Sequence, residues 1–168
     1  MRTRRLTRDA MLTGVALIIF IFELQLPPLT PVPGIKAGLA NIITVYAAFA
    51  IGLPDAAAIL IARILLGTAL SGNASALMYS LAGGALCLIA LCLLKPMLTK
   101  RQLWVAGVVG AAAHNLGQVT VAVAVTRTPE LLAYLPILMV SGMAAGLFTG
   151  LAAQALMKRI EKEKKRTE

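Results

Sequence analysis

Residues 75–94 read Ser-Ala-Leu-Met-Tyr-Ser-Leu-Ala-Gly-Gly-Ala-Leu-Cys-Leu-Ile-Ala-Leu-Cys-Leu-Leu. This run is continuously apolar and matches the ~20 residues that a helix needs to cross ~30 Å of hydrocarbon. A membrane barrel strand would be about half as long and would alternate polar with apolar residues. The stretch therefore predicts a transmembrane helix.

Similar runs recur along the whole chain. Hydrophobic residues make up 59% of the 168 residues and charged residues only 14%. A soluble domain of this size could not bury so much apolar surface in one core. The sequence therefore predicts an all-α membrane protein, with residues 1–168 forming a single domain of six transmembrane helices. The expected helices cover residues 10–27, 36–53, 56–72, 75–94, 103–126 and 131–157.

The basic residues indicate how these helices are oriented. The net charge is +9, and most of the positive residues lie in the N-terminal segment 1–9, in the loop 95–101 and in the tail 158–168. With six crossings these segments fall on one side, and the opposite loops hold only Lys36 and Arg127. The positive-inside rule then predicts a multi-pass protein of the bacterial cytoplasmic (inner) membrane with both termini in the cytoplasm. This pattern explains the charge without a nucleic-acid partner, and the basic tail is either a solvated helix end or a contact for anionic membrane lipid.

Two local features are expected to be structural. The first apolar run carries Glu23 and lacks a small-residue cleavage site, so we expect a retained helix and not a signal peptide. Cys87 and Cys92 lie five residues apart on one expected helix and point away from each other. They are expected to be packing residues and not a disulfide.

Small residues recur at a spacing of four on three of the expected helices. Lipid gives helices no hydrophobic drive to associate, so close packing depends on small residues that let two backbones approach. Each stripe packs inside the bundle or contacts a partner membrane protein, and spacing alone does not separate these alternatives. The stripes are Ala10 and Gly14 on the first helix, Gly107 and Ala111 on the fifth, and Gly142, Gly146 and Gly150 on the sixth.

Polar side chains inside the expected spans gather in the outer half and at the midplane. This asymmetry predicts a binding cavity that opens to the outside and is closed on the inside by apolar packing. The outer residues are Glu23, Lys36, Asn41, Asn73 and Tyr79, and the midplane residues are Arg63, His114, Asn115 and Gln118.

Each of these residues has an expected role in binding a ligand. Lys36 would attract an anionic ligand, and Arg63 with His114 would form the floor of the site. A guanidinium at bilayer depth costs roughly 2.5–3.5 kcal/mol, so Arg63 needs a carboxylate or an anionic ligand. Glu23 is the available internal partner; if they pair, Lys36 alone attracts the ligand, and otherwise both cations bind it. The residues expected to hydrogen-bond the ligand are Asn41, Asn73, Tyr79, Asn115 and Gln118.

The polar midplane residues also have a purely internal interpretation. His114 and Gln118 share a helix face, and Asn115 lies three residues before Gln118. These side chains could therefore satisfy one another or a neighbouring helix.

Enzyme chemistry is not supported by the composition. One histidine and two cysteines are too few for a common metal site, and there is no glycine-rich phosphate loop. The only aspartates are Asp9 and Asp55, so the paired aspartate clusters that hold magnesium in prenyl-chain synthases are absent. We expect no catalytic residues, no metal and no cofactor.

Three segments carry a resemblance to a known family. They are Ala-Met-Leu-Thr-Gly at 10–14, Pro-Val-Pro-Gly-Ile-Lys-Ala-Gly-Leu-Ala-Asn-Ile at 31–42 and Ala-His-Asn-Leu-Gly-Gln at 113–118. Over residues 9–157 the chain resembles the heptaprenyl diphosphate synthase component I family, also called the Gx transporter family. That family is similar to the substrate-binding S components of energy-coupling factor (ECF) transporters.

The resemblance implies an S-component-like bundle and a set of partners. In S components a small-xxx-small motif on the first helix packs against a membrane coupling protein; here it matches Ala10 and Gly14, with Gly in place of the second Ala. Substrate is held near the outer face, and separate ATPase subunits supply the energy. The sequence therefore predicts a membrane subunit that captures a small anionic or amphipathic organic molecule from outside.

Two other functions remain open from the sequence. One is a non-catalytic accessory subunit of isoprenoid or quinone metabolism that presents lipid substrate to a prenyl diphosphate synthase. The other is a structural membrane subunit whose midplane polar residues are all internally paired.

Overall fold

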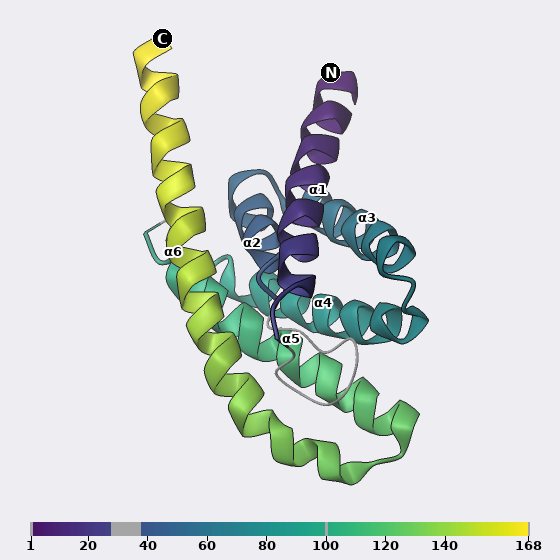
Figure 1. The fold of residues 1–168 in the computed structure, drawn as a ribbon. Coiled ribbons are helices and arrows are strands. Elements are labelled where there is room, and N and C mark those ends of the chain that lie inside the picture. Colours follow the sequence, from purple (N-terminus) through teal and green to yellow (C-terminus); the bar gives the residue numbers. More distant parts are fainter. Residues whose placement is uncertain (1, 28–37, 100, 168) are drawn as a thin grey trace.

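The computed structural model describes residues 2–27, 38–99 and 101–167, and every regular element in these ranges is helical (Figure 1). The prediction of an all-α protein with six α-helices is confirmed. A short 3-10 helix, η1, precedes the last of them. The elements are α1 (Arg2–Leu24), α2 (Asn41–Ala50), α3 (Leu53–Ser71), α4 (Ala74–Leu94), α5 (Leu103–Thr126), η1 (Pro129–Tyr134) and α6 (Leu135–Thr167).

The predicted boundaries agree best in the middle of the chain. The expected helix 103–126 coincides with α5, and the expected helix 75–94 begins one residue after the start of α4. The outer helices extend beyond the predicted apolar runs, since α1 begins at Arg2 and α6 ends at Thr167. By contrast α2, which was predicted over 36–53, has only 10 residues in the described part of the chain. Gly52 separates α2 from α3, and Pro54 occupies the first turn of α3, where its missing N–H costs no hydrogen bond.

Four segments are long and apolar enough to cross a membrane. They are α3, α4, α5 and the stretch Pro129–Ile160 that contains most of α6. The helix α1 has 23 residues but carries charged side chains near both ends, and α2 alone is about half the length of a span. The number of crossings, six, therefore stays a prediction.

The helix α5 lies at the centre of the packing. It contacts α4 and α6, whereas α1 packs on α3 and α2 and does not contact α6 within the described residues. Figure 1 shows the two termini at the same end of the molecule. An even number of membrane crossings requires this placement.

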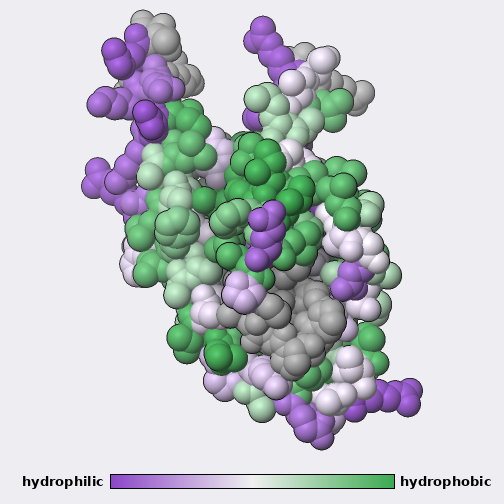
Figure 2. Space-filling view, in the orientation of Figure 1, coloured by the Kyte–Doolittle hydropathy of each residue, from purple (hydrophilic) through white to green (hydrophobic). Residues whose placement is uncertain are grey.

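Apolar side chains cover the outside of the helical body as well as its core. Leu70, Leu93 and Phe148 are each more than 60% exposed, although they lie inside helices of spanning length. Figure 2 shows this hydrophobic body below the hydrophilic projecting ends of α1 and α6. A surface of this kind is stable in lipid, where exposed apolar side chains carry no hydration cost.

Candidate functional site

Five buried polar side chains come together among the first five helices. None is more than 6% exposed, although the helices that carry them are largely apolar. We call this set the buried polar cluster. Its members are Glu23 on α1, Asn41 on α2, Arg63 on α3, and His114 and Gln118 on α5.

Glu23 belongs to the inward face of α1. Thr13, Ala16, Phe20 and Glu23 are all buried, and their helical spacing places them on the side of α1 that packs against the bundle. The Glu23 side chain accepts a hydrogen bond at Oε1 from the backbone N–H of Gly38, with a distance of 2.5 Å. This contact connects the end of α1 to the segment that leads into α2.

Gly38 brings the chain close to the cluster in a way that only glycine permits. Its φ of +81° lies in the left-handed region. A Cβ there would lie 2.9 Å from Asn41 Nδ2 and 3.3 Å from His114 Cδ2. Gly38 was not among the predicted site residues, although it lies in the segment Gly-Ile-Lys-Ala-Gly-Leu-Ala-Asn that carries the family resemblance.

Arg63 is the member of the cluster whose burial costs the most free energy. Its side chain is 5% exposed, and neither Nε nor Nη2 has a hydrogen-bond partner. It lies close enough to interact electrostatically with Glu23, Cys87 and His114. Asn41 is in a similar position, because neither its Nδ2 nor its Oδ1 is hydrogen-bonded.

His114 and Gln118 are paired with each other. The Gln118 Nε2 atom lies 3.0 Å from His114 Nε2, one helical turn away. Gly83 on α4 makes room for them, since a Cβ there would lie 2.9 Å from both Gln118 Cγ and His114 Cε1. This part of the internal interpretation agrees with the structure, and it does not extend to Arg63 and Asn41.

The other predicted site residues lie elsewhere. Asn73 caps α4, with its Oδ1 accepting from Ala76 N at 3.2 Å. Tyr79 is 3% exposed and packs in an apolar cluster with Val119 and Leu138.

Asn115 connects two helices, and its neighbour His114 belongs to the buried polar cluster. The Asn115 Nδ2 atom donates to the backbone oxygen of Leu138 at 2.5 Å, so this side chain faces α6. Lys36 lies outside the described residues.

The glycine stripes have two different environments. A Cβ on Gly150 would lie 2.6 Å from the Leu103 oxygen, and Gly142 and Gly146 likewise face residues of α5. The α6 stripe thus packs inside the chain. By contrast a Cβ on Gly14 would meet nothing within 4 Å, and Ala10 is exposed.

No metal centre is found in the part of the chain that the structure describes. Nowhere in these ranges do three or more His, Cys, Asp or Glu side chains come together. Cys87 is buried, Cys92 is exposed and both are free thiols.

The comparison with known families identifies the chain's relatives. Residues 12–156, which include the whole buried polar cluster, match the family described as heptaprenyl diphosphate synthase component I. The chain belongs to this family. Neither a curated protein nor a solved structure matches it significantly.

Membership in the component I family bears on two predictions. The description names a component of a synthase, which agrees with the prediction that this chain is not itself an enzyme. It also supports a protein partner in general.

Proposed function

We propose that this chain is a membrane-embedded binding subunit that holds a small anionic or amphipathic organic molecule at the buried polar cluster. The observation that supports this most strongly is Arg63, which is 5% exposed and has two nitrogens without hydrogen bonds. A ligand with carboxylate or phosphate oxygens would supply the missing acceptors.

The energetic argument rests on what Arg63 costs when no ligand is present. A buried donor without a partner costs about 1–3 kcal/mol, and more when the group is charged. The charge of Glu23 offsets part of this cost but provides no hydrogen bond to Nε or Nη2. Beside it, Asn41 adds an amide nitrogen and an amide oxygen that both lack hydrogen-bond partners. Such a combination is expected of a site that is completed by its ligand.

The position of the cluster favours capture from the outer side. In the predicted orientation Glu23 and Asn41 lie in the outer half of the membrane, and Arg63 and His114 lie near the midplane. Lys36 would add a positive charge at the entrance. Uptake would then need separate coupling and ATPase subunits, as in the ECF transporters whose S components this family is expected to resemble.

Native mass spectrometry of the full chain, purified gently from its own membrane, tests the binding. We expect the wild-type protein to retain a small molecule that is lost in Arg63→Gln and in Asn41→Ala. The matched control is Arg127→Gln, which removes an exposed arginine of the loop after α5 and should leave the bound molecule in place. Wild-type protein without a bound molecule, or persistence of the molecule in both cluster variants, would contradict the proposal.

Family membership favours a second function, that of an accessory subunit that presents a lipid substrate to a prenyl diphosphate synthase. This function predicts that a soluble prenyl diphosphate synthase co-purifies with the chain. A transporter subunit predicts co-purification of a membrane coupling protein and ATPases. Affinity purification from the native membrane followed by protein identification separates the two.

A further inference from the structure

A second site lies at the end of the molecule that holds both termini, away from the buried polar cluster. An open pocket of about 550 Å³ is lined by Arg4, Arg5, Arg8, Ile51 and Asp55, which belong to the first turns of α1, the end of α2 and the start of α3. Its lining carries three guanidinium groups and one carboxylate, and therefore a net charge of +2.

Asp55 holds two of these arginines in fixed positions. Arg5 donates from Nε to Oδ1 at 2.6 Å and from Nη2 to Oδ2 at 3.0 Å, and Arg8 donates from Nη2 to Oδ1 at 2.8 Å. Arg8 also donates from Nε and Nη2 to Asp9 Oδ1, with both distances 3.0 Å. The Arg5 side chain is 59% exposed, so without its two hydrogen bonds to Asp55 it would sample many rotamers. The carboxylate thus orders the basic pocket before a ligand arrives.

Arg4 differs from Arg5 and Arg8. It lines the same pocket, yet no carboxylate in the described part of the chain pairs with it. Its planar guanidinium can therefore donate two parallel hydrogen bonds to phosphate oxygens.

An apolar groove continues from this pocket along α1. A neighbouring pocket of about 440 Å³ is lined by Thr3, Arg4, Thr7, Arg8, Met11 and Leu12. It shares Arg4 and Arg8 with the first pocket, and it ends on Met11, which is 69% exposed. A basic head site and an apolar groove therefore meet at the same two arginines.

We propose that these two pockets form one site for a phosphate-bearing amphiphile. The phosphate binds Arg4 and the outer edge of Arg8, and the hydrocarbon chain lies over Met11 and Leu12. Each basic residue near anionic lipid at a membrane surface contributes about 1 kcal/mol to the binding free energy, which corresponds to about fivefold in affinity. The same chemistry is offered by a membrane phospholipid and by a free prenyl diphosphate.

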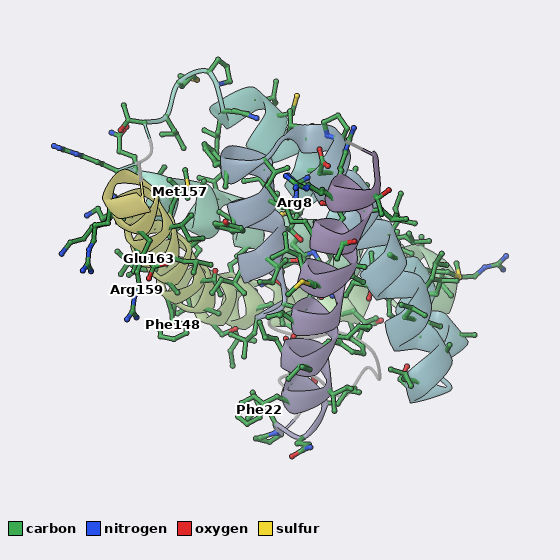
Figure 3. All side chains as sticks on the ribbon, turned by 90° about the horizontal axis from the view of Figure 1, so that it is seen from above. Arg8, Phe22, Phe148, Met157, Arg159 and Glu163 are labelled. Atoms are coloured by element: carbon green, nitrogen blue, oxygen red, sulfur yellow. The ribbon has the colours of Figure 1, made fainter. Side chains whose placement is uncertain are left out.

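The test is a native mass spectrometry titration of the full chain in detergent. The probes are dioleoyl phosphatidylglycerol, farnesyl diphosphate, inorganic phosphate and dioleoylglycerol, which has the tails without the phosphate. Arg4→Gln is expected to lower the affinity for the bound amphiphilic phosphate by about fivefold. The control is Arg159→Gln, an exposed arginine of α6 that Figure 3 shows well away from Arg8 on α1, and it should have no effect.

The four probes separate the outcomes. Arg4-dependent binding of phosphatidylglycerol supports the site and identifies a membrane lipid, and Arg4-dependent binding of farnesyl diphosphate alone supports it and identifies a free diphosphate. Equal binding of dioleoylglycerol, equally tight binding of inorganic phosphate, or equal effects of Arg4→Gln and Arg159→Gln would overturn it. The buried polar cluster shares no residue with this site, so either proposal can fail without the other.

Discussion

The α5–α6 interface and the outer surface of α1 carry the same sequence pattern in opposite surroundings. Along α6, Gly142, Gly146 and Gly150 lie against α5, and side chains larger than hydrogen would meet its backbone or Asn115. Along α1, the position of Gly14 is open and Ala10 is exposed. The same spacing therefore serves internal packing in one helix and leaves a free face on the other.

The two helices are also attached to the bundle by different interactions. The helix α6 is held by close backbone contact with α5 and by the hydrogen bond from Asn115 to Leu138. The helix α1 packs on α3 through Phe20, which contacts Gly67, and its first turns are joined to α3 by the ion pairs of Asp55. We infer that α6 is a fixed part of the fold and that the free face of α1 is available for a further contact.

The largest effect is expected from Gly146→Val. A Cβ at this position would lie 2.8 Å from Ala111 Cβ and would clash with the Gly107 carbonyl, so the two helices must separate. The free energy of unfolding should fall by about 3 kcal/mol. Circular dichroism during titration with sodium dodecyl sulfate measures it. Gly14→Val is the matched control, and an equal loss in both variants would remove the distinction between the two stripes.

A smaller loss is expected from Asn115→Ala, which removes the side-chain hydrogen bond between α5 and α6. The Leu138 oxygen loses its donor from α5, and the free energy of unfolding should fall by about 1–2 kcal/mol. The same titration applies. The control is Thr120→Ala, whose exposed hydroxyl bonds only to Leu116 O on its own helix. If the two substitutions cost the same, Asn115 does not hold the interface together.

The attachment of α1 to α3 is tested by Asp55→Asn. This change removes the charge that both Arg5 and Arg8 contact, so the first turns of α1 should separate from α3 more often. Trypsin should then cleave after Arg4, Arg5 or Arg8 several-fold faster in mild detergent. Global unfolding should change less than in Asn115→Ala, because the arginine side of each pair is largely exposed and such pairs contribute little to stability. Asp9→Asn is the control, since Asp9 pairs with Arg8 on the same helix. Unchanged cleavage would show that Asp55 does not hold α1.

The sequence predicted α3, α4 and α5 closely, and it predicted the bounds of α1, α2 and α6 less well. Hydrophobic length predicted α5 to the residue, because neither a proline nor an Asp, Glu, Lys or Arg interrupts the run between Leu103 and Thr126. It overestimated α2, since Ile51 and Leu53 continue the apolar pattern across Gly52 although the backbone does not continue the helix. A hydropathy pattern contains only the polarity of the side chains, whereas the end of α2 depends on the geometry of the backbone.

Only part of the candidate site was predicted, and the reason is related. Arg63 and Asn41 were selected because burying such groups in lipid is costly, and both are buried in the structure. Asn115 was placed with His114, but successive helix residues point about 100° apart, and the structure turns Asn115 to α6. Gly38 and Gly83 were missed because a residue without a side chain has no polarity signal, although it decides how closely the cluster assembles.

The smallest effect on the isolated chain is expected from Gly14→Leu, and it tests the free face directly. The open space at Gly14 accepts a side chain, and leucine favours a helix over glycine by nearly 1 kcal/mol, so stability should stay constant or rise slightly. If Ala10 and Gly14 pack against a partner membrane protein, the same change should remove that partner from the complex purified from native membranes. Met11→Leu on the neighbouring exposed position keeps the small stripe intact and should retain the partner. Loss of stability in Gly14→Leu would show that this face, like that of α6, is already occupied within the chain.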